Sequence, residues 1–203
     1  MLSGRGSTAV VLAAGLLAAC QKADMTGPSN TTAPATTLAA PSTDCGVECW
    51  AIKTLSDADS ARVDLVARPT NIAALNALPA RCASLPNSRL TPDELVTYEV
   101  VGRVTFVRLE DDRDFHVALA DPAGNTIATE VADPTCPGAV NSPNVDLLRT
   151  ARTTFVALGG TALIGQTLRV RGIAFYDFDH GQTGRSRSCL ELHPVIAVDR
   201  FSS

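Results

Sequence analysis

Aromatic side chains are scarce in this chain of 203 residues. They make up 4% of it, with one Trp, two Tyr and six Phe. Proteins that hold single-stranded nucleic acid stack its bases on aromatic rings. The formal net charge of −4 also opposes a polyanionic partner. The composition therefore argues against nucleic acid as a partner.

Familiar catalytic motifs are missing as well. The sequence has no G-x-S-x-G nucleophile elbow, no H-E-x-x-H zinc motif, no P-loop and no dinucleotide-binding fingerprint. These absences favour a protein that is not an enzyme and that needs no cofactor. A divalent metal remains an alternative, and it is treated below.

Long hydrophobic runs are also lacking, apart from one at the N-terminus. Residues 9–19 are all apolar or small and follow the positive Arg5. The run is shorter than the roughly 20 residues that span a bilayer, so it is typical of a cleavable signal peptide. It ends in Leu17-Ala18-Ala19-Cys20, which resembles the lipobox of bacterial lipoproteins. This resemblance implies cleavage before Cys20 and diacylglycerol on the Cys20 thiol.

The lipobox resemblance divides the N-terminal part into a signal peptide, residues 1–19, and a lipidated start at Cys20. Gln21 follows the cysteine, and this pattern implies sorting to the outer membrane, with the protein facing the periplasm. Residues 20–44 are rich in Thr, Ala, Pro and Ser, which predicts a disordered tether. The alternatives to the lipobox are a plain secretory signal with a chance cysteine and a short membrane anchor, and the alternative to the tether is a structured arm.

Five cysteines follow Cys20, and an oxidising compartment favours disulfides between them. An odd number leaves one cysteine free or paired with another chain. Five choices of that cysteine, with three pairings of the rest, give fifteen schemes that sequence does not separate. Cysteine–histidine catalysis is disfavoured by the same oxidation. The five are Cys45, Cys49, Cys82, Cys136 and Cys189.

Two regions make up the predicted folded part. In residues 45–89 a helical spacing of Ile72, Leu75 and Leu78 predicts a small helical cap. From residue 90 to residue 203 the apolar period changes to two, which predicts strands.

The predicted elements of residues 90–203 follow the order strand, strand, strand, helix, strand, strand. Gly102 predicts a bend in the first strand, and Ser142 and Pro143 predict the start of the helix. This order is that of the OB-fold, a five-stranded Greek-key barrel with a helix between strands three and four. We therefore expect a mainly β (α+β) barrel of this type, with a general α+β sandwich as the alternative. The predicted spans are 96–106, 115–119, 126–131, 142–158, 167–178 and 189–198.

One motif resembles a group of exported bacterial proteins of unknown function. It comprises Phe175-Tyr176-Asp177-Phe178-Asp179-His180-Gly181-Gln182-Thr183-Gly184 and Glu191-Leu192-His193-Pro194-Val195. The group carries a pattern close to F-F-D-x-x-H-G-Q-T-G-x-A-P-N-x-I-E-L-H-P-V. This chain has Arg185-Ser186-Arg187-Ser188-Cys189 where the group has x-Ala-Pro-Asn-x. The resemblance extends over about residues 50–200 and implies an exported protein, but no particular reaction. A weaker similarity to the OB-type barrel of staphylococcal-type nucleases carries no residues over.

The three histidines and nearby carboxylates are candidate metal ligands. Imidazole and carboxylate together suit Zn²⁺ or another divalent ion. The alternative is a buried polar network without a metal, because buried polar groups must be paired whether or not they act. The candidates are His116, His180, Glu191, His193, Asp177 and Asp179.

A ligand surface is predicted where the loop between strands four and five meets the loop after the first strand. The former has flexible glycines and two arginines, and the latter is acidic, with Glu110, Asp111, Asp112 and Asp114. The arginines either form a ridge for an anion or pair with the acidic loop. The ligand-binding candidates are His180, Gly181, Gln182, Thr183, Arg185, Arg187 and Trp50.

These observations favour a membrane-anchored, non-catalytic binding or interaction module of the envelope. Its partner would be an envelope glycan or a protein. The alternatives are a metal-dependent phosphodiester hydrolase that uses the HGQTG and ELH segments, and a surface protein without any ligand.

Overall fold

The computed structural model describes residues 45–83 and 87–202. The signal peptide, Cys20 and the tether lie outside the described residues. None of the described helices is long and apolar enough to span a membrane. The elements are α1 (Trp50–Lys53), η1 (Ser60–Arg62), β1 (Asp64–Pro69), α2 (Ile72–Asn76), η2 (Asp93–Leu95), β2 (Val96–Leu109), β3 (Phe115–Ala120), β4 (Thr126–Val131), η3 (Ala139–Asn141), α3 (Val145–Leu158), η4 (Gly160–Leu163), β5 (Thr167–Tyr176) and β6 (Leu190–Arg200).

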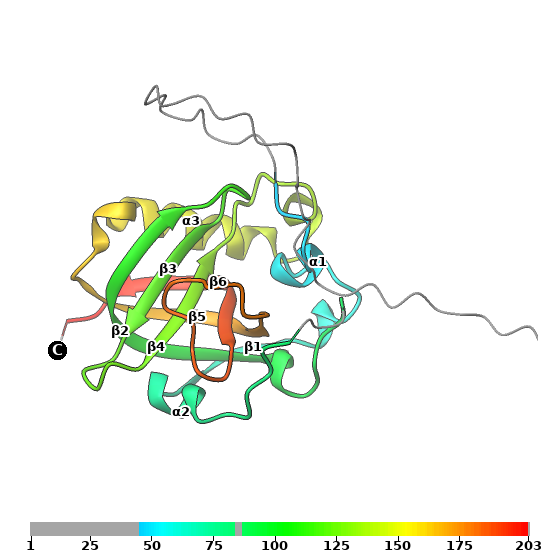
Figure 1. Cartoon of the computed structure of the whole chain (residues 1–203). Helices are drawn as coiled ribbons and strands as arrows, with labels where there is room; N and C mark the ends of the chain where they lie inside the picture. Colours follow the sequence, from blue (N-terminus) through cyan, green and yellow to red (C-terminus); the bar gives the residue numbers. More distant parts are fainter. Residues whose placement is uncertain (1–44, 84–86, 203) are drawn as a thin grey trace, which may run out of the picture.

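Five of the six strands form a closed barrel (Figure 1). The sheet runs β1-β2-β3-β4-β6-β5, and β2 also pairs with β5, which closes the cylinder. Helix α3 joins β4 to β5, and only the β4–β6 contact within the barrel is parallel. This is the strand order of an OB-fold, so the predicted barrel with a helix between its third and fourth strands is confirmed.

The first barrel strand, β2, closes the cylinder because it bends at its middle. Residues 97–103 pair with β5, whereas residues 103–109 pair with β3. Gly102 lies at this change of partner, where a Cβ atom would come within 2.9 Å of side-chain atoms of Ile72 and Leu119. A side chain at this position would therefore displace the core, which explains the glycine that predicted the bend.

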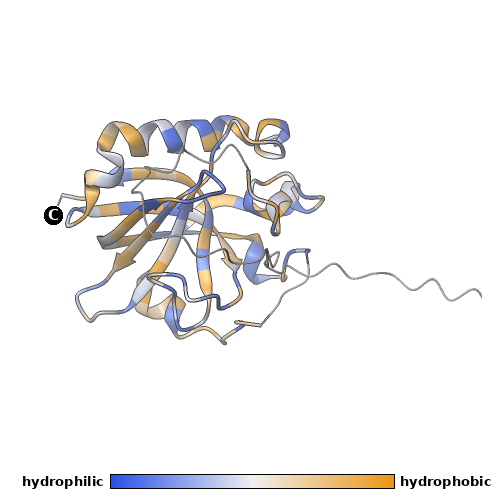
Figure 2. Cartoon of the chain, turned by 45° about the horizontal axis from the view of Figure 1, so that its top comes forward, coloured by the Kyte–Doolittle hydropathy of each residue, from blue (hydrophilic) through white to orange (hydrophobic). Residues whose placement is uncertain are grey.

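The core fills the barrel, and helices α3 and α2 lie on opposite sides of it (Figure 1). Phe155 and Ala151 of α3 and Ile72 and Leu75 of α2 are buried with the inward-facing strand residues. Figure 2 shows hydrophobic and hydrophilic residues alternating along α3, as expected of a helix with one buried face. Burying Phe155 contributes about 3–5 kcal/mol, judged from the usual cost of truncating such a residue to Ala.

The prediction that residues 45–89 form a small helical cap is wrong in one respect, because this segment contains strand β1. This strand runs parallel to the start of β2 at the edge of the sheet. Its side chains do not alternate between buried and exposed, and Leu65 and Val66 are both exposed. The missing alternation explains why the two-residue period did not reveal it. The rest of the segment contains α1, η1 and α2, as expected for a cap.

The cap is fixed to the barrel by buried charges. The Arg89 side chain is fully buried, with Nη2 2.7 Å from Asp57 Oδ2 and 3.2 Å from the carbonyl oxygen of Ile52. Glu94 accepts hydrogen bonds from the backbone N–H groups of Leu90 (2.6 Å) and Tyr176 (2.7 Å). These contacts join residues 52–57 and 89–94 to the end of β5, so the cap and the barrel share one interior.

The predicted start of α3 is shifted by two residues. The helix begins at Val145 with Asn144 as its N-cap residue, whose side chain makes no capping hydrogen bond. Ser142 does not cap the helix and instead donates to the carbonyl oxygen of Leu55 (2.8 Å). A distant tertiary contact thus uses the hydroxyl that the local pattern assigned to the helix.

Two disulfides connect distant parts of the described chain. Cys45 is bonded to Cys136, and Cys82 to Cys189. Cys49 is also disulfide-bonded, and no free cysteine occurs in the described part of the chain. Of the two outcomes expected for the odd cysteine, a free thiol is therefore not found among these residues, and pairing with another chain stays a prediction. In the chain-entropy model, each disulfide closes a loop of about 100 residues in the unfolded chain, and the entropy lost there stabilises the fold by about 4–5 kcal/mol.

Candidate functional site

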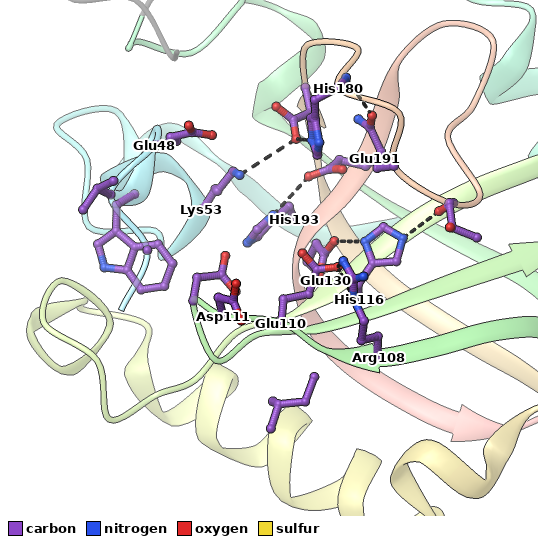
Figure 3. Close-up of a pocket in the computed structure, with 18 of the residues that line it drawn as sticks. Glu48, Lys53, Arg108, Glu110, Asp111, His116, Glu130, His180, Glu191 and His193 are labelled. Carbon is purple, nitrogen blue, oxygen red and sulfur yellow. Dashed lines mark hydrogen bonds and ion pairs between the residues drawn. The ribbon is translucent and has the colours of Figure 1, made fainter. Parts of the chain in front are cut away.

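A pocket of about 760 Å³ lies on the outside of the barrel, where β2, β3, β4 and β6 carry polar side chains (Figure 3). The β2–β3 loop borders it, as do the β5–β6 loop and the segment before α1. Its volume falls within the roughly 300–1,000 Å³ usual for small-ligand sites. Its lining comprises Cys45, Gly46, Val47, Glu48, Trp50, Lys53, Phe106, Arg108, Leu109, Glu110, Asp111, Asp112, His116, Glu130, Asp177, His180, Gly181, Gln182, Thr183, Glu191 and His193.

His116 connects two strands and a loop at the floor of this pocket. Its Nδ1 atom donates to Glu130 on the neighbouring strand β4, and its Nε2 atom donates to the carbonyl oxygen of Thr183 (2.6 Å). Burial by itself lowers the pKa of His116, but the bonds to Glu130 and Thr183 outweigh it and raise the pKa to about 9. Burial raises the pKa of Glu130 to about 7 despite its bond to His116.

His193 forms the second imidazole–carboxylate group. Its Nδ1 lies 3.0 Å from Glu191 Oε1, and its Nε2 lies 3.3 Å from Asp114 Oδ2. Burial by itself lowers the pKa of His193, but the two carboxylates outweigh it and raise the pKa to about 9. The buried ring is therefore a cation near neutral pH, held between two acids.

Asp177 forms the third group, with His180 and Lys53. Its Oδ2 lies 3.3 Å from His180 Nε2 and 3.9 Å from Lys53 Nζ. Burial favours the neutral acid, but His180 and Lys53 outweigh it and hold the pKa of Asp177 below its usual range. Asp177 raises the pKa of His180 in turn. Lys53 also lies over the ring of Phe175, with Nζ 5.4 Å from the centroid, and reaches the pocket from α1.

Some polar atoms of this site are buried without a hydrogen bond. Within the described residues they are Glu130 Oε2, His193 Nε2 and Asp114 Oδ2. His193 and Asp114 face each other as an ion pair, but Glu130 Oε2 has no hydrogen-bond partner. An unsatisfied buried acceptor costs about 1–3 kcal/mol, so a hydrogen-bond donor that reaches Glu130 Oε2 would remove this cost.

The predicted ligand-binding residues divide into two groups. Trp50 and the loop residues His180, Gly181, Gln182 and Thr183 line the pocket, and they meet the acidic β2–β3 loop there as expected. The predicted arginines, Arg185 and Arg187, do not line it.

Arg185 instead lies 3.3 Å from Asp179, and its Nη1 lies 3.1 Å from Cys189 Sγ, beside the disulfide. Arg187 is exposed, and its backbone N–H donates to Asn76. Within the described residues neither arginine pairs with the β2–β3 loop. The expected pairing with the acidic loop is therefore wrong, and an anion ridge formed by these arginines would lie outside the pocket and stays a prediction.

The metal-ligand hypothesis receives no support from the geometry. Within residues 45–83 and 87–202, no group of three or more His, Cys, Asp or Glu side chains is arranged to hold a metal ion. Asp179 does not line the pocket, and its carboxylate pairs with Arg185. The other five candidates, His116, His180, Glu191, His193 and Asp177, line it as members of the three imidazole–carboxylate groups.

Glu130 and Lys53 are important site residues that the sequence-based site did not include. Glu130 could have been found from the hairpin of β3 and β4. Ala120 pairs with Thr126 next to the turn, and moving four residues away from the turn along each strand pairs His116 with Glu130. The position of Lys53 in the pocket could not be predicted from strand register, because a short helix remote in sequence brings it there.

Comparisons with known proteins add little. No family model and no curated protein matches the chain. Among solved structures, the chain is similar to a protein named as an aspartyl-tRNA synthetase from Leishmania major Friedlin, at 13% sequence identity and a TM-score of 0.37. The match extends over 68% of this chain and 21% of that one. A similarity this weak carries no argument about function.

Proposed function

We propose that this protein is a lipid-anchored envelope protein whose barrel binds a ligand in the pocket without chemical conversion. The observation that carries the binding role is the pocket itself. Two loops and the outer face of the barrel meet there around buried polar atoms that lack hydrogen bonds, such as Glu130 Oε2. The outer barrel face between these two loops is where OB-folds hold their ligands.

We propose that the ligand is not chemically converted because the ionisable side chains of the pocket are already paired with one another. His116, His180 and His193 each face a carboxylate, and the pKa of each is raised. His116 and His193, whose pKa values are raised to about 9, are protonated near neutral pH and cannot serve as general bases, and the one described cysteine that lines the pocket, Cys45, is in a disulfide. The arrangement stabilises charges in place and leaves the described pocket residues without an activated nucleophile.

The binding role is tested with the full-length protein and soluble fragments of bacterial envelope, both glycan and peptide. Val47 lines the pocket and is 78% exposed, so Val47→Phe narrows the entrance without disturbing the core. Val156→Phe is the matched control, because Val156 is an exposed residue of α3 that does not line the pocket. We expect some of these fragments to raise the melting temperature of the wild type and of the control variant, but not the melting temperature of Val47→Phe. Equal shifts in all three proteins, or none, would contradict the proposal.

The membrane anchor is tested separately by mass spectrometry of the protein from the membrane fraction. The lipobox resemblance predicts an N-terminus at Cys20 that carries diacylglycerol, and loss of membrane association in Cys20→Ala. Peptide mapping without reduction distinguishes the alternatives. Cys20 found in a disulfide, or an uncleaved N-terminus, would contradict the lipid anchor while leaving the binding role intact.

A further inference from the structure

The cations around the pocket are already engaged by carboxylates. Lys53 and His180 pair with Asp177, His116 with Glu130, and His193 with Glu191 and Asp114. Arg108, at the end of β2, pairs with Glu110 at 2.6 Å. An anionic ligand would have to displace one of these carboxylates before it could gain a cation.

Several lining carboxylates, in contrast, form no salt bridge, although Asp111 still interacts electrostatically with Arg108, and Asp112 with Lys53 and His193. Of the described pocket residues, Glu48, Asp111 and Asp112 are acids that form no salt bridge. Asp112 accepts only the backbone N–H of Asp114, at 3.1 Å. Glu130 adds its unpartnered Oε2 atom. In the view of Figure 3, Glu48 and Asp111 border the pocket on the side away from His116.

Trp50 adds an aromatic surface to this acidic lining. Its Nε1 atom donates to the carbonyl oxygen of Pro137, which fixes the orientation of the indole. Trp is the aromatic side chain that attracts cations most strongly through its ring face. Free carboxylates, an unpartnered buried acceptor and an indole together match an ammonium group.

We infer that the pocket takes a small organic cation, a ligand with one or more primary amines. This inference rests on the proposed binding function and adds the class of ligand. The ammonium groups would lie among Glu48, Asp111 and Asp112. The volume of about 760 Å³ suits a small molecule.

The experiment follows the fluorescence of Trp50, which is the single tryptophan of the chain. The full-length protein is titrated with spermidine, with the neutral sugar maltotriose and with the anion tripolyphosphate. The variant Glu48→Gln/Asp111→Asn removes two free charges and keeps their shape. Asp146→Asn is the control, because Asp146 is an exposed carboxylate on α3 that does not line the pocket.

We expect saturable binding of spermidine to the wild type and to Asp146→Asn, and at least fivefold weaker binding to the double variant. Raising the salt concentration should weaken binding further. Tighter binding of maltotriose or tripolyphosphate would overturn the amine inference while supporting the binding function. A spermidine affinity unchanged in the double variant, or no saturable signal with any probe, would overturn the inference. The Val47→Phe comparison would then decide the binding function on its own.

Discussion

The Nε2 atom of His116 lies 2.6 Å from the carbonyl oxygen of Thr183, which connects a barrel strand to the centre of the HGQTG loop. The opposite ring nitrogen donates to Glu130. A protonated imidazole has two N–H donors, and both are used here. One side chain therefore holds a neighbouring strand and the β5–β6 loop in register, and this shapes the floor of the pocket.

His116→Ala should destabilise the fold by about 3–5 kcal/mol, because it leaves Glu130 buried without its cation. The double variant His116→Ala/Glu130→Gln should cost less than the two single changes together, because the stranded charge is then gone. Urea unfolding of the four proteins measures this coupling. Effects that add within about 0.5 kcal/mol would show that the pair is not coupled.

Two glycines of the β5–β6 loop allow a matched test of how closely this loop approaches the barrel. Both have positive φ, 80° at Gly184 and 81° at Gly181. A Cβ at Gly184 would overlap Ala118 of β3, whereas one at Gly181 would meet nothing within 4 Å.

Gly181→Ala should therefore cost about 1 kcal/mol from backbone strain alone, and Gly184→Ala should cost at least 2 kcal/mol more because the loop must move off β3. Thermal unfolding would compare the two. Equal losses would mean that the loop does not lie against the strand.

The sequence predicted the barrel well because its signals are local. The alternation of Val100, Gly102 and Val104, the bend at Gly102 and the Gly159-Gly160 helix end are found in the structure, and β2 continues to Leu109. The alternation fails at Phe106, because a register shift after Val104 places Phe106 in the pocket and Val107 in the core. Strand β1 was missed because it lacks alternation. The start of α3 was misplaced because Ser142 bonds to Leu55, a partner 87 positions away.

The candidate site was predicted only in part. The sequence indicated which loops would meet, because the OB-fold topology fixes this, and the histidines were visible. The partner of each histidine depends on strand register and on the cap, which a list of residue types does not contain. Arg185 and Arg187 were assigned to the site from their loop, yet they lie beside the Cys82–Cys189 disulfide.

The two described disulfides should affect the pocket differently. Cys45 lines the pocket, and its bond to Cys136 holds the segment that leads to Trp50, whereas the Cys82–Cys189 bond lies outside the lining. Cys45→Ala/Cys136→Ala should therefore increase quenching of Trp50 fluorescence by acrylamide. Cys82→Ala/Cys189→Ala should lower stability by about 2–5 kcal/mol with quenching unchanged. Quenching that rises equally in both would contradict this assignment.

The stability of the fold should fall as the pH rises from about 5 to about 9. The folded state holds protons more tightly than the unfolded chain at Glu130, whose pKa is raised to about 7, and at His116 and His193, whose pKa values are raised to about 9. The unfolded chain loses these protons first, so the contribution of Glu130 is lost from about pH 4.5 to 7, and that of the histidines from about pH 6.5 to 9.

Urea unfolding at pH 5, 7 and 9 measures this slope. His193→Asn should flatten the fall between pH 6.5 and 9 by roughly 3–4 kcal/mol, since the pKa of His193 is raised from 6.5 to about 9 and one unit of pKa corresponds to about 1.4 kcal/mol. Stability that rises up to about pH 6.5 and is flat from there to pH 9 would show that the buried imidazoles are neutral in the folded protein.

Hydrogen exchange of the full-length protein, with and without an envelope fragment that raises its melting temperature, tests most directly that two loops of the OB-like barrel form one ligand site. The account predicts slower exchange in both the β2–β3 loop, residues 110–114, and the β5–β6 loop, residues 177–184, with β1 at residues 64–69 unchanged. Protection confined to β1, or to one of the two loops alone, would contradict it.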